Sequence, residues 1–286
     1  YSGLSSNNIL WIHDTLFFEE EFVFGYNKNY YEKEKKQLLE RANNAKFIIT
    51  PSKYSKDKIK KFLNVEDEKV IVQYCQVDRM DYDSVLNDQI FIQKVRDKFK
   101  INKKNKSIIF IGSPHYRKNL KTVIDVFNKL NKKFHDLNLI VVSYPRKDIP
   151  KTYNLYSNLK NNKNIKLLSH VSNNELIALI KISEILLNPT LEEGFGLPNI
   201  EAQICETIVV SSKISCIPEI LSNSAILVNP LDIDEIYHSC LNILTNKIDC
   251  ENIIKRGLQN SLRFTDLNSY NKLHDLIIKI SDESSC

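Results

Sequence analysis

The sequence predicts an α/β fold made of two Rossmann-like domains facing a cleft, of which the N-terminal one is incomplete. Three observations lead to this prediction. Short runs rich in Ile, Val and Leu alternate with helical patterns along most of the 286 residues, which indicates parallel sheets covered by helices. A charged, unpatterned stretch at residues 95–107 separates two such blocks. The first block contains too few strands for a complete doubly wound sheet.

The first block, residues 1–100, contains three strand-like runs and two helical patterns. The runs are NNILWIH (7–13), FIITPS (47–52) and KVIVQYC (69–75). Helical patterns occupy about 28–45 and 53–63. We therefore expect a partial Rossmann-like domain that lacks its front half. The first residue is Tyr1 rather than Met, so we also expect the chain to be a fragment.

The second block, residues 101–265, contains the strands and helices of a complete Rossmann-like domain. The strand candidates are residues 107–112, 137–144, 164–171, 184–190, 207–212 and 225–230. A helix with one apolar face is predicted over 119–134. Two further helical stretches, about 250–264 and 266–281, close the chain, and we expect 266–286 to pack back toward the N-terminal domain.

Composition excludes several classes of protein. Hydrophobic content of 42% and charged content of 26% are typical of soluble globular proteins, and no apolar run reaches the roughly 18 residues of a membrane span. The net charge of +5 is spread over Lys-rich helices without a basic stripe, which argues against nucleic-acid binding. Six cysteines without CxxC or metal-type spacing indicate a reducing, cytosolic compartment. Residues 53–62 (KYSKDKIKKF) are either a solvated helix face or a peripheral membrane contact.

The loop GSPHYRKN, residues 112–119, follows a predicted buried strand and leads into a helix. Open α/β folds bind ligands at such strand ends. Arg117 and Lys118 stand at the helix N-terminus, where backbone N–H groups and the helix dipole favour an anion. Two cations there are unfavourable unless a phosphate binds between them and the helix. The alternative is a solvated surface pair.

A second loop, TLEEGFGLPNIEA at residues 190–202, holds two of only six glycines in the chain, Gly194 and Gly196. Glycine allows the backbone to turn sharply and to come close to a ligand. Glu193 lies at the strand end, and Glu201 lies near the first turn of the following helix. Carboxylates in these places could accept hydrogen bonds from sugar or ribose hydroxyls. Alternatively, Glu193 is a solvated loop residue and Glu201 merely complements the helix dipole.

These stretches resemble those of a known family. EGFGLPNIE resembles the E-x7-E signature of retaining glycosyltransferases of the GT-B fold, specifically glycosyltransferase family 4. The family's phosphate loop and first helix resemble residues 110–127 (FIGSPHYRKNLKTVIDVF). Its base-binding strand and the segment that leads to the signature resemble residues 167–190 (LLSHVSNNELIALIKISEILLNPT). SCIPEIL and AILVNPLDIDEIYHSCLNIL follow in the family's order. WIHDTLF and ITPSKYSKDKI resemble the second half of its N-terminal, acceptor-side domain. The resemblance spans nearly the whole chain.

The resemblance implies an enzyme that transfers a sugar from a nucleoside-diphosphate sugar to a carbohydrate, lipid-linked or protein acceptor. The anomeric configuration would be retained by attack on the face from which the diphosphate departs, without a covalent intermediate. Because no DxD motif is positioned to hold the diphosphate, we expect neither a metal nor another cofactor. The occurrence of HD at residues 13–14 together with RKN at residues 117–119 resembles mannosyltransferase-like members of the family. We expect a cytoplasmic protein of polysaccharide or glycoconjugate biosynthesis, with membrane association left open.

The resemblance also assigns roles to residues. The catalytic residues would be His13, Arg117, Lys118 and Glu193. Of these, Lys118 and Arg117 would neutralise the departing diphosphate, and Glu193 would face the hydroxyls of the transferred sugar. The donor would be held by Gly112, Ser113, His170, Val171, Gly194, Phe195, Gly196, Leu197 and Glu201. Within that set, His170 and Val171 would contact the base, backbone N–H groups at residues 195–197 the sugar or diphosphate, and Glu201 the ribose.

The sequence departs from the family in three places. Ser113 stands where an Arg is common, and we expect Arg117 to substitute for it. After the signature, Glu206 and Ile208 replace a usual Gly and Pro, so Glu206 must cap the helix differently or carry strain. No glycine-rich loop precedes Tyr1. Two alternatives therefore stay open: a non-catalytic nucleotide-sugar-binding subunit, and a GT-B sugar-nucleotide epimerase.

Overall fold

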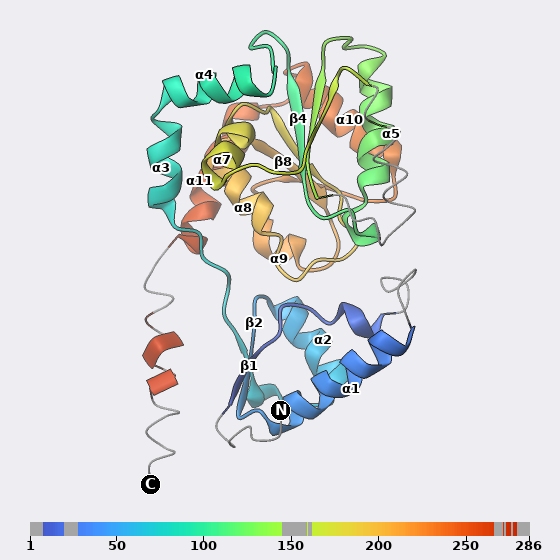
Figure 1. The fold of residues 1–286 in the computed structure, drawn as a ribbon, viewed down its shortest axis with the longest axis vertical. Helices are drawn as coiled ribbons and strands as arrows, with labels where there is room; N and C mark the ends of the chain where they lie inside the picture. Colours follow the sequence, from blue (N-terminus) through green and yellow to red (C-terminus); the bar gives the residue numbers. More distant parts are fainter. Residues whose placement is uncertain are drawn as a thin grey trace. The chain divides into compact units, whose positions relative to one another are not determined.

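The computed structural model describes residues 8–19, 28–144, 159, 162–265, 271, 273–275 and 277–278. The chain divides into two compact units (Figure 1). In the described ranges, the first unit contains the residues up to Gln76, Glu193–Phe195 and the residues described after Thr265. The second unit contains those of Val77–Glu192 and Gly196–Thr265. None of the helices in these ranges is both long enough and apolar enough to cross a membrane.

The first unit is built on a three-stranded parallel sheet in the order β1-β2-β3. Its elements are β1 (Ile9–Trp11), η1 (Leu16–Phe18), α1 (Lys28–Asn44), β2 (Phe47–Thr50), α2 (Lys53–Leu63), η3 (Asp67–Lys69) and β3 (Val70–Val72). The buried side chains Ile12 and Ile48 of the sheet region pack with Ala42 of α1 and Ile59 of α2. All three predicted strands and both predicted helices are confirmed.

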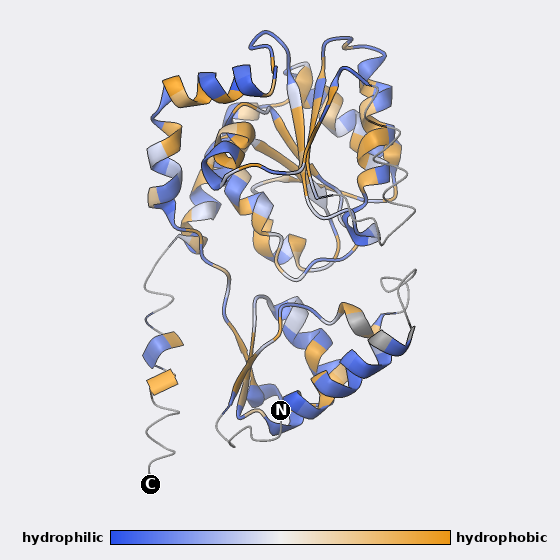
Figure 2. Cartoon of the chain, in the orientation of Figure 1, coloured by the Kyte–Doolittle hydropathy of each residue, from blue (hydrophilic) through white to orange (hydrophobic). Residues whose placement is uncertain are grey.

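The second unit contains a six-stranded, fully parallel sheet in the order β6-β5-β4-β7-β8-β9. The strands are β4 (Ser107–Ile111), β5 (Asn138–Val142), β6 (Ile165–Leu168), β7 (Ile185–Asn188), β8 (Ile208–Ser212) and β9 (Ile226–Val228). Every strand predicted in the second block is confirmed. Nearly continuous apolar runs allow the strands to be buried on both faces, and Figure 2 shows hydrophobic residues, in orange, along the strands.

Helices cover both faces of this sheet. They are α3 (Arg79–Leu86), α4 (Gln89–Lys98), α5 (Leu120–Asn131), α7 (Asn173–Lys181), α8 (Leu197–Ile204), α9 (Ile217–Leu221), α10 (Ile233–Leu244) and α11 (Cys250–Ser261), with short 3₁₀ turns η4 (Tyr116–Lys118) and η5 (Leu262–Phe264). On one face α5 packs beside α10, and on the other α8 packs beside α11 and α7 (Figure 1). The predicted helix over 119–134 is confirmed as α5, whose apolar stripe includes Val123 and Phe127.

The boundary between the units differs from the predicted one. It lies between Gln76 and Val77, whereas the sequence placed it at residue 100 with a hinge at 95–107. Helices α3 and α4 pack on α7 of the second unit. The short apolar stripe of α4, Ile92 and Val95, is buried there. Charge dominated the sequence pattern of this region and concealed that stripe.

The ends of the chain are partly described. The helix predicted over about 250–264 is confirmed by α11 and η5. The helix predicted over about 266–281, and its expected packing toward the N-terminal domain, lie largely outside the described residues.

Candidate functional site

The order of the six strands fixes where the second unit can bind a ligand. Strand β4 pairs with β5 on one side and with β7 on the other. The chain adds β5 and β6 outward from β4, then returns to place β7, β8 and β9 on the opposite side. Open α/β sheets bind ligands at the carboxyl ends of the strands where the order reverses in this way. The loops that follow β4 and β7 therefore flank the candidate site.

The loop after β4 carries a buried lysine. Lys118 is 8% exposed, which is unusually deep burial for a lysine. Its Cγ and Cδ atoms lie 3.3 Å from the position that a Cβ atom would take at residue 112. Gly112 itself is held at the end of the strand, since its N–H donates to the Val142 carbonyl oxygen at 3.1 Å. A glycine at 112 thus makes room for the lysine stem beside the strand end.

Arg117 connects the two loops that flank the switch point. Its Nη1 donates to the carbonyl oxygen of Glu192 at 3.0 Å. Its own carbonyl oxygen accepts hydrogen bonds from the N–H of Leu191 at 2.7 Å and from Oγ1 of Thr190 at 3.0 Å. Whatever charge it offers to a ligand, Arg117 also fixes the position of the loop after β7.

Asn119, which the sequence did not identify, anchors the same region. Its backbone is left-handed (φ 57°, ψ 38°), a conformation that Asn tolerates better than most residues. Its buried Nδ2 donates to the carbonyl oxygens of Pro189 at 3.0 Å and Pro230 at 2.8 Å, and its Oδ1 accepts from Oγ1 of Thr122 at 2.8 Å. Asparagine between a basic pair and a helix is the only sequence signal for this role.

Helix α8 presents Glu201 from its second turn. Gly196 precedes the helix with φ 83° and ψ 48°, a left-handed conformation that favours glycine. The Glu201 side chain is partly buried, and the hydroxyl of Tyr82 on α3 donates to its Oε1 at 3.0 Å. Burial raises the pKa of Glu201, and the hydrogen bond from Tyr82 partly opposes that rise. Tyr82 was not predicted, because 119 positions separate it from Glu201.

Residues Glu193–Phe195 of the loop after β7 group with the first unit. Within that unit, a Cβ atom at Gly194 would lie 2.2 Å from the carbonyl oxygen of His13, a separation that no side chain can occupy. The Gly194 carbonyl oxygen accepts from Oγ of Ser55 at 3.3 Å. The Phe195 ring lies 6.3 Å from that of Tyr74. A close approach of two backbones therefore explains Gly194 without a ligand.

Two histidines were predicted at strand ends. His13 follows β1, is exposed, and its ring centroid lies 5.8 Å from that of Trp11. His170 follows β6 and is exposed. Its ring meets that of Tyr144 edge-on at 5.2 Å, and Tyr144, at the end of β5, is 60% exposed. Tyr144 was not predicted, although an aromatic residue after an apolar strand was available as a signal.

The structure thus separates the predicted site residues into two groups. In the second unit, the carboxyl ends of β4, β6 and β7 and the following helix α8 carry Gly112, Ser113, Arg117, Lys118, His170, Val171, Gly196, Leu197 and Glu201. The first unit contains His13, Glu193, Gly194 and Phe195. Gly112 lies against the side chain of Lys118 in the second unit, and Gly194 lies against the backbone of His13 in the first unit.

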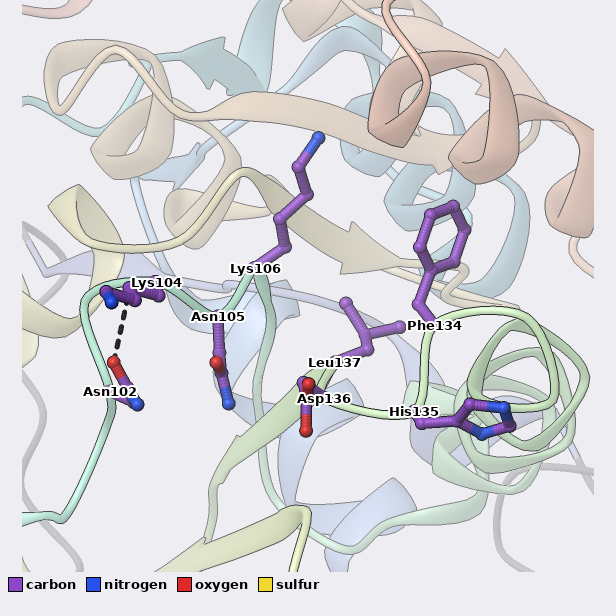
Figure 3. A pocket seen from close by; sticks show the side chains of 8 residues that line it. All are labelled: Asn102, Lys104, Asn105, Lys106, Phe134, His135, Asp136 and Leu137. Atoms are coloured by element: carbon purple, nitrogen blue, oxygen red, sulfur yellow. Dashed lines mark hydrogen bonds between the residues drawn. The ribbon is translucent and has the colours of Figure 1, made fainter.

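A hollow of about 550 Å³ lies away from these strand ends (Figure 3). It is lined by Asn102, Lys104, Asn105, Lys106, Phe134, His135, Asp136 and Leu137. These residues precede β4 and β5, so the hollow is at the amino edge of the sheet. Nζ of Lys106 donates to the Leu244 carbonyl oxygen at 2.6 Å, at the end of α10.

Among the residues that the structure describes, no three His, Cys, Asp or Glu side chains gather as metal ligands.

The two parallel-sheet units define an α/β protein of the GT-B class. Sucrose-phosphate synthase from Thermosynechococcus elongatus superposes with a TM-score of 0.78 at 14% identity, covering 96% of this chain and 68% of that one. Anabaena Alr3699/HepE, solved in complex with UDP and glucose, gives a TM-score of 0.75 at 17% identity and covers 95% and 71%. The chain belongs to the family "Glycosyl transferases group 1", whose profile matches residues 91–260.

Curated relatives add a narrower likeness. The O-antigen chain mannosyltransferase RfbU of Salmonella typhimurium is 30% identical over 232 residues, which cover 80% of this chain and 58% of the relative. The O-antigen chain mannosyltransferase B of Escherichia coli is 24% identical over 231 residues, covering 80% and 60%. The chain therefore spans about three fifths of the length of these relatives.

Proposed function

We propose that the second unit is the donor site of a retaining glycosyltransferase of family 4, which transfers a sugar from a nucleoside-diphosphate sugar to an acceptor. The observation that supports this most directly is the placement of a buried Lys118 in the loop after β4 and of Glu201 on α8, the helix that follows β7, so that both flank the switch point. Lys118 is a cation just before a helix begins, and Glu201 is a carboxylate that can accept hydrogen bonds from hydroxyl groups. A diphosphate and a ribose offer these two features on one molecule.

The proposed chemistry follows from the charge that develops as the diphosphate leaves. Negative charge grows on its oxygens, and Lys118 would stabilise it in a site where little solvent competes. The backbone N–H groups at the start of α5 would contribute in the same sense. Arg117 would act mainly by holding the loop after β7, as its bond to Glu192 suggests. Retention of configuration would follow from attack on the face that the diphosphate leaves.

The donor sugar is proposed from the relatives. Two of them are named as O-antigen chain mannosyltransferases, which favours a mannosyl donor. The exposed Tyr144 and His170 at neighbouring strand ends offer aromatic faces for the base. We also propose a carbohydrate, lipid-linked or protein acceptor, catalysis without a metal, and a cytoplasmic location. Peripheral membrane contact through residues 53–62 stays the alternative to a solvated helix face.

A thermal-shift panel of UDP-, GDP- and ADP-sugars would first identify the donor. Calorimetry with the matching nucleoside diphosphate would then compare Lys118→Ala and Glu201→Ala with the unchanged chain. We expect affinity to fall by about a hundredfold in the first variant, since a charge-assisted contact contributes roughly 1.5–3 kcal/mol. Lys121→Ala is the matched control, because Lys121 lies three residues further on in the first turn of α5 and pairs with Asp125 at the surface.

Unchanged affinity in both site variants would refute the assignment of this site. Transfer is tested separately with the identified donor and a panel of simple glycosides, with the product anomer read by NMR. An inverted product would exclude the retaining mechanism. Epimerised free sugar in the absence of an acceptor would instead support the epimerase.

A further inference from the structure

We propose that Tyr82 is a positioning residue for Glu201: its hydroxyl holds one carboxylate oxygen so that the other is directed to the ligand. This inference rests on the proposed function, because it assumes that Glu201 binds the ribose. Tyr82 itself would touch neither sugar nor diphosphate.

The geometry gives each carboxylate oxygen a different task. The Tyr82 hydroxyl donates to Oε1 of Glu201 at 3.0 Å. Within the described part of the chain, this is the one hydrogen bond that the Glu201 side chain accepts. A carboxylate has two oxygens that accept hydrogen bonds. Oε2 is therefore left for a hydroxyl of the ligand, while rotation about the last side-chain bond is restrained by the bond to Oε1.

Tyr82 is itself held firmly. It is 4% exposed, and Val85, on the same face of α3, is 3% exposed. Helix α3 packs on α7 and is capped by Asp78, whose side chain accepts from the N–H of Met80 at 2.9 Å. Just before the helix, the N–H of Val77 donates to the Phe264 carbonyl oxygen at 2.7 Å. A hydroxyl fixed in this way can orient a functional carboxylate in advance of binding.

The charges around the pair favour this arrangement. Burial and the nearby Glu201 carboxylate raise the pKa of Tyr82, so the phenol stays a neutral donor at all ordinary pH values. Cys205, which directly follows α8, is buried, and burial raises the pKa of its thiol. Lys181 of α7 faces this end of α8 but is paired with Glu206 at 2.5 Å. On α3, Asp81 is the charged neighbour of Tyr82.

Loss of the Tyr82 hydroxyl should therefore change how ligand affinity depends on pH. The Tyr82 hydrogen bond lowers the pKa of Glu201, whereas burial raises it. In Tyr82→Phe only the burial remains, so the carboxylate is protonated at a higher pH than in the unchanged chain. Binding that needs an ionised Glu201 should then weaken at a higher pH as the solution is acidified.

The test compares affinities for a nucleoside diphosphate and its 2′- and 3′-deoxy analogues, by calorimetry between pH 5 and pH 8. The chain variants are Tyr82→Phe, Glu201→Gln and their combination. We expect Tyr82→Phe to weaken binding of the ribonucleotide about tenfold, as for one hydrogen bond, and to leave at least one deoxy analogue unaffected. The acid limb of its affinity profile should move to higher pH. The double variant should bind no more weakly than Glu201→Gln alone.

Two controls separate this role from simple packing. Tyr237→Phe makes the same chemical change on the partly buried face of α10 and should leave every affinity unchanged. Equal weakening of ribo- and deoxynucleotides by Tyr82→Phe, without a shift in the acid limb, would show that Tyr82 only supports the fold. If Glu201→Gln weakens ribonucleotide binding and Tyr82→Phe does not, the inference is wrong and the proposed function stands. If the unchanged chain binds no nucleoside diphosphate, both are wrong.

Discussion

Glu206 stands where the resembled family usually has glycine, and its backbone adopts the conformation that glycine favours. Its φ is 61°, which is the left-handed conformation usually given to glycine after a helix. The N–H of Glu206 donates to the Gln203 carbonyl oxygen at 3.1 Å, and the N–H of Thr207 to that of Ala202 at 2.9 Å. These are the two bonds of a Schellman motif. Glu206 therefore caps α8 as glycine would and carries the strain.

Replacing Glu206 with glycine should stabilise the protein. Relief of the left-handed conformation is worth about 1–2 kcal/mol, and part of this is offset by the greater freedom of glycine in the unfolded chain. The surface ion pair with Lys181 contributes little. We expect Glu206→Gly to raise the free energy of unfolding by about 0.5–1 kcal/mol in urea titrations. Lys255→Gly, inside α11 and exposed, should lower it by about 1 kcal/mol; two changes of the same sign would contradict this account.

Glu201 should limit stability at neutral pH. Burial raises its pKa, so the folded state disfavours the ionised form. Its unfavourable contribution is absent below the ordinary carboxyl range, where both states are protonated, and grows as pH rises through the pKa of the folded state. Glu201→Gln should therefore have a higher Tm than the unchanged chain at pH 8, and the difference should disappear near pH 4. Equal Tm values at both pH values would mean that this carboxylate is not desolvated.

The loop between β4 and α5 owes its shape to hydrogen bonds that reach other elements. Asn119 joins it to the segment after β7 and to the turn before α10, and Arg117 joins it again to the loop after β7. Both loops of the switch point are thus one hydrogen-bonded unit. A change in either loop is expected to move the other.

Removal of the Asn119 side chain should lower the free energy of unfolding, because this side chain joins three elements. Asn119→Ala leaves the carbonyl oxygens of Pro189 and Pro230 without their donor, and it places alanine in a left-handed conformation. We expect the free energy of unfolding to fall by about 2–4 kcal/mol. Asn119→Gly loses the same hydrogen bonds without the strain, so it should be about 1 kcal/mol less damaging in the same titration. Equal losses would show that the backbone conformation contributes nothing.

Elements were easier to predict than contacts. Within the described residues, all nine strands and helices such as α2 and α5 follow from local apolar patterns, because the periods of strands and helices are visible in neighbouring residues. The predicted strands also place Lys118 after β4 and His170 after β6, as in the structure, while the roles of both residues stay predictions. Tyr82 could not be found in this way, because its partner Glu201 is brought to it by tertiary packing. The boundary at residue 100 failed for the same reason: only the packing of α4 on α7 assigns that helix to the second unit.

At the scale of the whole molecule, each unit has its own sheet and its own buried core. A ligand that binds only folded protein stabilises it by RT ln(1 + [L]/Kd), about 2.7 kcal/mol at a hundredfold excess over Kd. If the donor site belongs to the second unit, a nucleoside diphosphate should raise the unfolding temperature of that unit. Hydrogen exchange of β4 and β7 should slow on binding, while that of β1 and β2 stays the same. Protection confined to the first unit would contradict this placement.

The switch point between β4 and β7 also has a consequence for the order of folding. Ser107 and Glu184, which bond to each other at the start of these two strands, are 77 positions apart. Closing so long a loop is entropically expensive and slow compared with pairing between strands that are near in sequence. As the chain emerges during synthesis, β4 can pair with β5 well before β7 exists, and its other edge remains open. The pairing of β4 with β7, beside which we place the ligand, therefore closes the longest loop of any strand pair in this sheet and should form more slowly than the pairing of β4 with β5.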